Sequence, residues 1–263
     1  MKKRVISAIV ALIIVIPLVI LGGYPYYAGI GLLSIIGFYE ITNVYEREKK
    51  LPIFVKCISL LSFMCIAMTS IHRTTFNIDY RMFLLDLFVC LLPLIVIKRK
   101  HYDCNDAFFL LGVTMFLGIA FNFMIVIRNI SIHYLLYTLL ITISSDTFAH
   151  FFGTKIGKHK LFPEVSPNKT IEGFIGGTFF GTLVGSLYFL TFVSTNASVF
   201  LVIIISLALS IISACGDLVF SAIKRRFDVK DYGNIMPGHG GVLDRLDSFT
   251  LVVLAFSYLV SLF

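Results

Sequence analysis

The chain has 263 residues, of which 58% are hydrophobic and only 14% are charged, and its formal net charge is +7. The charged fraction is about half of that in a soluble globular protein, so the composition excludes a soluble globular fold and indicates a protein that lies mainly in lipid. The positive net charge does not indicate nucleic-acid binding, because Lys and Arg form short clusters between apolar segments instead of one continuous basic face.

Nine apolar segments are long enough to be helices that cross a hydrocarbon core of about 30 Å, where every backbone polar group must be paired within the protein. The first segment follows three basic residues as in a signal peptide, but it is longer than the usual apolar region and has no Ala-x-Ala cleavage site, which favours an uncleaved span. The predicted spans, in chain order, are 5–22, 25–45, 52–72, 82–97, 107–127, 132–152, 171–193, 197–222 and 245–262. The sequence therefore predicts an all-α, polytopic integral membrane protein with about nine transmembrane helices.

Positive charge alternates between the loops on the two sides of these spans. Nineteen of the 22 Lys and Arg residues fall on the side of the N-terminus, and only Arg73, Arg81 and Arg128 fall on the other side. Because Lys and Arg resist translocation, this alternation predicts a cytoplasmic N-terminus and an external C-terminus. The predicted location is the bacterial inner (cytoplasmic) membrane, with the chain as a multi-pass protein.

The two halves of the chain differ in their polar residues. Residues 1–130 hold five spans with few polar side chains, and we interpret the carboxylates of Glu40 and Asp86 there as snorkelling or helix-pairing groups. Residues 131–263 hold four spans and two long cytoplasmic loops, 153–170 and 224–244, which are rich in Gly, Pro and polar residues. We therefore predict an N-terminal packing or lipid scaffold and a C-terminal catalytic domain.

A glycine stripe marks the seventh span, where Gly173, Gly177, Gly181 and Gly185 recur at four-residue spacing. Such a stripe lets another helix backbone approach closely. The sequence leaves two alternatives open, which are tight packing within one subunit and a homodimer interface.

Carboxylates in the last four spans are the main candidates for chemistry, because an Asp at the centre of a membrane helix costs about 2.5–3.5 kcal/mol on insertion scales. Asp146 and Asp217 lie at the cytoplasmic ends of their spans, and Asp244 and Asp247 lie at the start of the last one. Hard Mg²⁺ prefers oxygen ligands and takes others from water and substrate phosphate, whereas zinc would require Cys or more than one spaced His. These four carboxylates therefore predict a divalent metal site that handles phosphates. The alternative is that they form helix caps and salt bridges with nearby Lys and Arg.

The spacing of Asp217, Ser221 and Lys224 is i, i+4 and i+7, which predicts that the three side chains share one helix face directed into the second loop. In that loop, 236–241 reads MPGHGG and precedes a helix, which is a design suited to binding phosphate through backbone N–H groups. A tight turn is the alternative. In the first loop, 153–158 lacks the spacing and the Ser or Thr of a Walker motif, and its lysines remain candidates for polyphosphate or anionic lipid headgroups.

The segment 221–247, which reads SAIKRRFDVKDYGNIMPGHGGVLDRLD, closely resembles the signature of the phosphatidate cytidylyltransferases, also called CDP-diacylglycerol synthases. An upstream block, with DTFAHFFG at 146–153, GKHKL at 157–161 and SPNKTIEG at 166–173, is similar to a second conserved block of that family. The first five spans match the family only in hydropathy. Met236 replaces the usual Leu, Ile or Phe, which is a conservative change. His150 replaces a common aromatic residue, which argues against a catalytic role for His150.

The resemblance implies the reaction of CTP with phosphatidate to give CDP-diacylglycerol and pyrophosphate at the cytoplasmic membrane face. It implies Mg²⁺ as the cofactor, leaves the presence of a second cation open, and makes CTP, phosphatidate and membrane lipid the partners. Metal ligation is expected from Asp217 and Asp244, and catalytic support from Asp146, Asp247, Lys224 and Arg225. The expected substrate-binding residues are Ser166, Asn168, Lys169, Ser221, Lys230, Asp231, His239, Gly240, Gly241 and Arg245.

Two other classes of protein share some of these features. A CDP-alcohol phosphatidyltransferase also places Asp residues in the membrane, but it carries an Asp-Gly-x-x-Ala-Arg motif that this chain lacks. A transporter of an anionic solute would place polar residues across the membrane, whereas here they gather on one predicted side and the halves show no inverted repeat.

Overall fold

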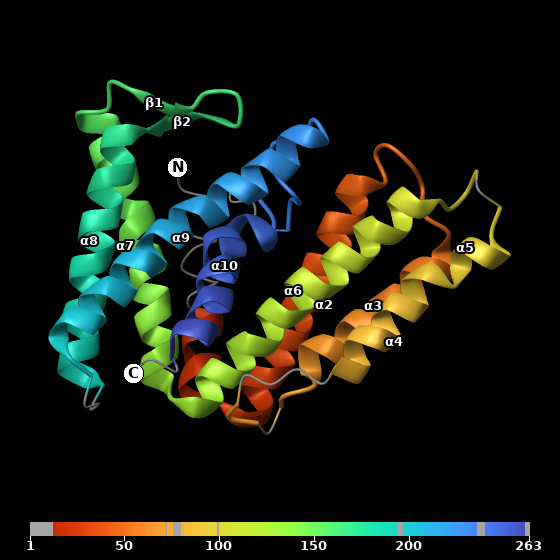
Figure 1. The fold of residues 1–263 in the computed structure, drawn as a ribbon, viewed down its shortest axis with the longest axis horizontal. Coiled ribbons are helices and arrows are strands. Elements are labelled where there is room, and N and C mark those ends of the chain that lie inside the picture. Colours follow the sequence, from red (N-terminus) through yellow and green to blue (C-terminus); the bar gives the residue numbers. More distant parts are fainter. Residues whose placement is uncertain are drawn as a thin grey trace. The chain divides into compact units, whose positions relative to one another are not determined.

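A computed structural model describes residues 13–71, 73–75, 80–98, 100–193, 197–235 and 240–260. In these ranges the chain is nearly all helical, and a pair of short strands accompanies the helices (Figure 1). The chain forms two compact units. The first comprises Met1–Asn129 and Asp231–Asp244, and the second comprises Ile130–Lys230 and Arg245–Phe263.

The first unit is built from helices in antiparallel succession. Residues 13–21 are helical, and α2 (Gly23–Tyr45), α3 (Ile53–Met68), α4 (Tyr80–Leu91), α5 (Pro93–Val96) and α6 (Cys104–Ile130) follow. The predicted span 82–97 is divided at one residue, because α4 ends at Leu91 and α5 begins at Pro93, while Leu92 between them keeps helical backbone angles. Proline has no backbone N–H to donate and its ring crowds the preceding turn, so a helix usually breaks there.

A buried carboxylate joins three helices of the first unit. The Asp86 side chain on α4 is fully buried, and it accepts hydrogen bonds from the Ser62 hydroxyl on α3 (2.7 Å) and from the Thr114 hydroxyl on α6 (2.6 Å). These bonds compensate the carboxylate for lost hydration. Asp86 therefore pairs helices, as the sequence predicted.

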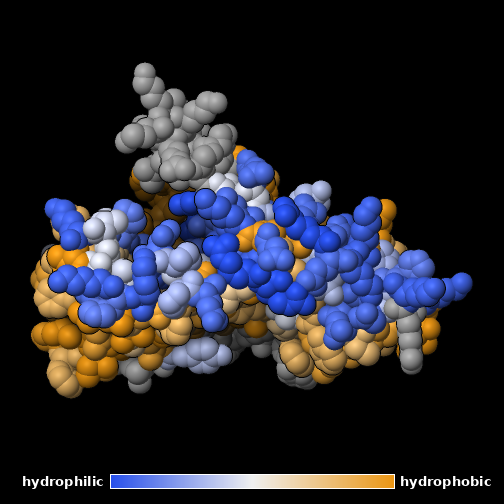
Figure 2. Space-filling model, turned by 90° about the horizontal axis from the view of Figure 1, so that it is seen from above, coloured by the Kyte–Doolittle hydropathy of each residue, from blue (hydrophilic) through white to orange (hydrophobic). Residues whose placement is uncertain are grey.

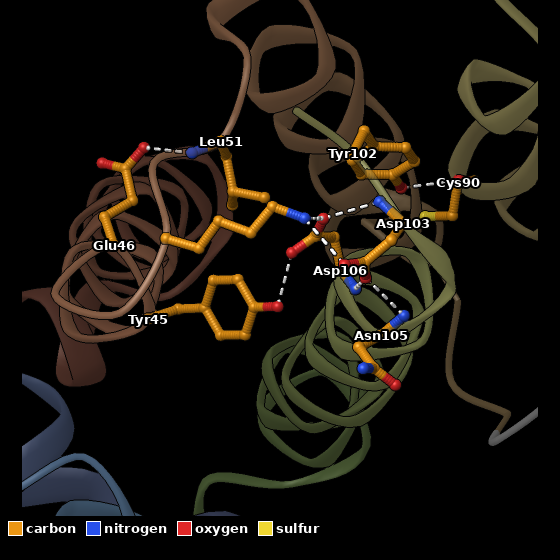
Figure 3. A network of polar contacts seen from close by, with 9 residues as sticks. Tyr45, Glu46, Leu51, Cys90, Tyr102, Asp103, Asn105 and Asp106 are labelled. Atoms are coloured by element: carbon orange, nitrogen blue, oxygen red, sulfur yellow. Dashed lines mark hydrogen bonds and ion pairs between the residues drawn. The ribbon is translucent and has the colours of Figure 1, made fainter. Parts of the chain in front are cut away.

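A second polar network joins the α2–α3 connection to the start of α6 (Figure 3). The Lys49 ammonium lies 2.8 Å from Asp103 and 2.5 Å from Asp106, and the Tyr45 hydroxyl donates to Asp106 at 2.6 Å. The hydrogen bond from Lys49 lowers the pKa of Asp103 below its usual value. The stabilisation from this pair is therefore present at neutral pH and is lost as the pH falls through the lowered pKa.

The second unit contains α7 (Ile132–Lys155), β1 (Lys160–Phe162), β2 (Ser166–Thr170), α8 (Ile171–Phe192) and α9 (Val199–Arg226), together with α10 (Leu243–Leu259) from Arg245 onward. The strands are antiparallel, with Lys160 opposite Thr170 and Phe162 opposite Ser166. The predicted all-α fold is confirmed in the coarser sense that the described chain is nearly all helical, whereas this hairpin inside the predicted loop 153–170 was not predicted. The strands are short, and Pro167 and Asn168 belong to residue types that are depleted in strands, so no strand pattern is visible in these residues.

The glycine stripe of α8 packs against α7 of the same chain. A Cβ added to Gly173 would lie 2.6 Å from the Ala149 carbonyl oxygen, and one added to Gly177 would lie 2.6 Å from that of Ser145. Further along the stripe, a Cβ on Gly185 would strike the Ile141 side chain. Of the two alternatives for the stripe, the structure shows tight packing within one subunit.

Replacing Gly177 by Ala is expected to destabilise the protein, because the new methyl group would push α7 away from α8. Overpacking of this kind costs about 1–3 kcal/mol. The matched control is Gly112→Ala in α6, where a Cβ meets no atom within 4 Å. Thermal unfolding in detergent should show a lower Tm for Gly177→Ala and an unchanged or slightly higher Tm for Gly112→Ala. Equal Tm values for the two variants would contradict the packing argument.

Among the described residues, five helices are long and apolar enough to cross a membrane, namely α2, α6, α7, α8 and α9. Large apolar side chains cover their outer surfaces; Ile175, Phe179 and Leu187 of α8, for example, are 61%, 60% and 57% exposed. Figure 2 shows hydrophilic residues gathered on the face seen from above, where the second unit carries its β1–β2 hairpin. The protein is therefore an integral membrane protein.

The finer predictions of nine spans and of the sidedness of the termini stay predictions. Two described helices, α3 with 16 residues and α10 with 17, are shorter than a usual span. The predicted fourth span is interrupted, and part of the predicted first span lies outside the described residues.

Candidate active site

A cavity of about 600 Å³ lies in the second unit among α7, α8, α9 and the β1–β2 hairpin. Most of its lining residues belong to the upstream block that resembles the family, and Ala214 and Asp217 come from α9. Among the lining residues are five predicted site residues, Asp146, Ser166, Asn168, Lys169 and Asp217. The structure thus brings together residues from two predicted spans and one predicted loop.

An ion pair crosses one wall of this cavity. The Lys169 ammonium on β2 lies 2.7 Å from Asp217 Oδ2 on α9, and it also donates to the Ala214 carbonyl oxygen at 3.4 Å. The Ser221 hydroxyl donates to Asp217 Oδ1 at 3.2 Å, as expected for residues one helical turn apart. The side chains of Lys169 and Asp217 are 24% and 31% exposed, so both remain accessible to a ligand in the cavity.

The hairpin that carries Lys169 is fixed at both ends. Thr170 is the N-cap of α8, and its hydroxyl oxygen accepts the Gly173 N–H at 3.1 Å. Glu172, in the first turn of α8, accepts the backbone N–H groups of Lys158 (3.1 Å) and His159 (3.2 Å) and the His159 Nδ1 at 2.6 Å. These bonds hold the loop before β1 against the start of α8, and they limit the movement of Lys169.

Negative charge exceeds positive charge around the cavity. Asp146 interacts electrostatically with two like charges, Asp217 and Asp247, and with one opposite charge, Lys169. Within the described part of the chain, no three His, Cys, Asp or Glu side chains are grouped closely enough to hold one metal ion. A metal here would therefore find at most two side chains of these four types among the described residues, and its other ligands would come from other protein oxygens, water or substrate.

The predicted basic residues of α9 and of the following loop have different surroundings. Lys224 is buried, whereas Lys230 and Arg245 of the second unit are exposed. Arg225 donates to the carbonyl oxygens of Val165 (3.3 Å) and Val229 (3.2 Å). Arg225 thus fastens the turn of the hairpin to the end of α9, which the sequence did not predict, while its predicted contact with phosphate stays a prediction.

The remaining predicted residues belong to the first unit. Asp244 Oδ2 accepts the backbone N–H groups of Tyr232 (2.8 Å) and Gly241 (2.9 Å), and Gly240 has a φ of 81°, which favours glycine. The Gly241 N–H, predicted to bind phosphate, therefore bonds to Asp244 in this structure. Asp231 is exposed, and His239 lies outside the described residues.

Because Asp217 belongs to the second unit and Asp244 to the first, their joint role as metal ligands stays a prediction. The contact between Glu40 and the signature segment was not predicted from the sequence. The Glu40 carboxylate accepts backbone N–H groups of Val242 and Leu243, which lie 202 and 203 residues further along the chain. Local sequence patterns carry no signal for such a contact.

Lys169→Met is expected to lower activity about 10-fold or more, because the cavity would lose its cation beside Asp217 and with it an electrostatic contact to substrate phosphate. Lys160→Met, on the exposed side of β1 in the same hairpin, is the matched control and should retain wild-type activity. Steady-state rates at several substrate concentrations provide the measurement. Equal rates for the two variants would remove Lys169 from the site.

The fold and the cavity define a class, which is a helical integral membrane protein with a pocket lined by both carboxylate and ammonium groups. Comparison with known proteins identifies the family. The sequence model described as the cytidylyltransferase family matches residues 2–263. The chain belongs to the cytidylyltransferase family and is therefore a nucleotidyltransferase, which confirms the resemblance seen in the sequence.

Relatives of known name match almost the whole chain. The phosphatidate cytidylyltransferase of Staphylococcus haemolyticus (strain JCSC1435) is 39% identical over 254 residues, which are 96% of this chain and 96% of the relative. Proteins of the same name from Staphylococcus aureus (strain COL) and Staphylococcus saprophyticus are each 38% identical, with the same coverage.

Proposed function

We propose that the protein is a phosphatidate cytidylyltransferase, which converts CTP and phosphatidate into CDP-diacylglycerol and pyrophosphate in phospholipid biosynthesis. The observation that carries this proposal is the Lys169–Asp217 pair at the wall of a cavity in a membrane-embedded helical unit. The names of the relatives supply the substrate class. A membrane pocket with both charges suits a lipid phosphate that meets a nucleotide from water.

The proposed reaction is an in-line displacement at phosphorus. A phosphatidate oxygen attacks the α-phosphorus of CTP, a new phosphorus–oxygen bond forms, and the bond between the α-phosphorus and the oxygen bridging to the β-phosphorus breaks. Pyrophosphate leaves with the electron pair of that bond. No strong general base is needed, because the phosphate of phosphatidate is largely ionised at neutral pH.

We also propose Mg²⁺ as the cofactor, and the residues of the cavity fit this ion. Asp146 and Asp217 offer carboxylate oxygens in a region of excess negative charge, and Mg²⁺ usually takes one or two protein carboxylates together with water and phosphate oxygens. Asp217 and Asp244 are the proposed ligands, with Asp146 and Asp247 in support. When bound, the ion would offset negative charge on the reacting phosphates.

The basic and polar side chains would bind and orient the substrates. Lys169, with Ser166, Asn168 and Ser221, would contact the lipid phosphate, and Ser221 also holds Asp217 through its hydroxyl. Lys224, Arg225, Lys230 and Arg245 would contact the phosphates of CTP or of phosphatidate, and Asp231, His239, Gly240 and Gly241 are the other proposed substrate-binding residues. The preference of the site for polyanionic ligands follows from these cations.

We place the reaction at the cytoplasmic face of the bacterial inner membrane, where positive-inside orientation puts the two long loops. A homodimer, which the sequence left open, would have to use a surface other than the glycine stripe, since α7 covers that stripe.

The test is incorporation of label from CTP into lipid by the purified protein. With [α-³²P]CTP, phosphatidate and Mg²⁺, the proposal predicts labelled CDP-diacylglycerol and an equal amount of pyrophosphate. Release of CMP from CDP-diacylglycerol in the presence of an alcohol, without any transfer from CTP, would indicate a phosphatidyltransferase instead. No transfer in either assay, combined with solute uptake by proteoliposomes, would indicate a transporter.

A further inference from the structure

Glu40 is a buried carboxylate of the first unit that accepts backbone hydrogen bonds from the signature segment. Its side chain lies on α2, and the residue is 3% exposed. Oε1 accepts the Val242 N–H at 2.9 Å, and Oε2 accepts the Leu243 N–H at 2.9 Å. Both carboxylate oxygens are therefore used, and both bind the same short stretch of chain.

These bonds replace a missing helix cap. The first N–H groups of a helix have no partner within the helix, and a Ser, Thr, Asp or Asn at the N-cap usually accepts one of them. Residue 242, which precedes α10, is a valine and has no acceptor in its side chain. Glu40 supplies the acceptors from α2, and its negative charge also suits the positive end of the helix dipole.

Glycines at positions 233 and 241 leave room for the Glu40 carboxylate. A Cβ on Gly233 would lie 2.5 Å from Glu40 Oε1, and a Cβ on Gly241 would strike the same oxygen. One helical turn earlier on α2, Gly37 leaves room for Leu243, whose side chain would lie 3.1 Å from an added Cβ. Small residues therefore let both ends of the segment 233–243 close on α2.

Asp244 is held by the same segment. Its Oδ2 accepts the N–H groups of Tyr232 and Gly241, so two carboxylates, Glu40 and Asp244, organise neighbouring backbone donors of one loop. A shift of Val242 and Leu243 away from Glu40 would carry Asp244 with it, because Asp244 is the next residue in the chain.

We propose that Glu40 is a positioning residue for the transfer reaction, which fixes the backbone of 241–243 and thereby the carboxylate of Asp244. This inference rests on the proposed function, in which Asp244 is a metal ligand. In this role Glu40 acts through the loop that it binds, as partners that orient a ligand do in other metal sites.

The test compares Glu40→Gln with Asp86→Asn, a matched change of another buried carboxylate in the same unit that binds hydroxyl groups far from the loop in sequence. In Glu40→Gln an NH₂ group would face a backbone N–H and lose that bond. We expect kcat to fall about 10- to 100-fold, with a rise in the Mg²⁺ concentration for half-maximal activity. Asp86→Asn should lower Tm while it leaves kcat and the Mg²⁺ dependence unchanged.

Two further variants keep the test decisive if Glu40→Gln folds poorly. Gly233→Ala, which would push on the Glu40 carboxylate, should reproduce the loss of kcat, and Glu40→Asp, which keeps the charge, should lose less than Glu40→Gln. Wild-type kcat and Mg²⁺ dependence in Glu40→Gln or in Gly233→Ala would overturn the proposal.

Amide hydrogen exchange separates this proposal from the proposed function. Faster exchange at residues 241–244 in Glu40→Gln, without faster exchange in α6, is the expected result whether or not the wild type makes CDP-diacylglycerol. Unchanged exchange at 241–244 would overturn the positioning role, whereas failure of the wild type in the CTP assay would overturn only the proposed reaction.

Discussion

Asp217→Asn should reduce the rate of CDP-diacylglycerol formation at least about 100-fold, because the cavity would lose the carboxylate that faces Lys169 and that we propose as a Mg²⁺ ligand. The fold should persist. The Asn oxygen can still accept the Ser221 hydroxyl, and a partly exposed ion pair contributes only about 0–1 kcal/mol. The measurement is the initial rate with labelled CTP, alongside Tm in detergent.

Asp103→Asn is the matched control for this prediction. It removes another Lys–Asp ion pair, between Lys49 and Asp103, and Asn remains a good helix cap there. This variant should keep wild-type activity. If Asp217→Asn retains more than about a tenth of the wild-type rate, Asp217 is not a metal ligand.

Asp244→Asn should also lower the rate about 100-fold or more, although its local structure should survive. The Asn side-chain oxygen can take the place of Oδ2 and accept the N–H groups of Tyr232 and Gly241, while the negative charge is lost. Rates and amide exchange at residues 232 and 241 should be compared with those of Asp244→Ala, which loses charge and acceptor together.

The comparison of these two variants separates two roles of Asp244. Loss of activity in both variants, with amide exchange altered only in Asp244→Ala, would indicate that the reaction needs the negative charge of Asp244 and not only its hydrogen bonds to the loop. Wild-type activity in Asp244→Asn and low activity in Asp244→Ala would show that Asp244 only caps the backbone, and it would remove Asp244 from the metal site.

Sequence periodicity predicted what one helix can place on one face. Asp217 and Ser221, which are spaced i, i+4, form a hydrogen bond, and the glycine stripe of α8 packs closely against α7. Chemical character predicted Asp86 as a helix-pairing carboxylate, because a charge buried in lipid must find partners on neighbouring helices.

Two local features were not predicted, and only the first of them has a marker in the sequence. Pro93 marks the break between α4 and α5, and the uninterrupted hydropathy of 82–97 hid it. The β1–β2 hairpin consists of strands too short for an alternating pattern, and it forms because Thr170 and Glu172 fix its ends.

The association of Asp231–Asp244 with the first unit could not be predicted from the sequence. It depends on Glu40, Gly37 and Leu243, whose contacts join positions some 200 residues apart. Amphipathic patterns report burial within one element and give no information on which distant element covers it.

Binding of Mn²⁺ in place of Mg²⁺, measured by electron paramagnetic resonance on the purified protein with CTP, tests the central claim most directly. We expect CTP-dependent binding in the wild type and in Asp103→Asn, and a strong loss of affinity in Asp217→Asn and in Asp244→Asn. Wild-type Mn²⁺ affinity in either of those last two variants would contradict the claim that the Asp217 and Asp244 carboxylates hold the metal.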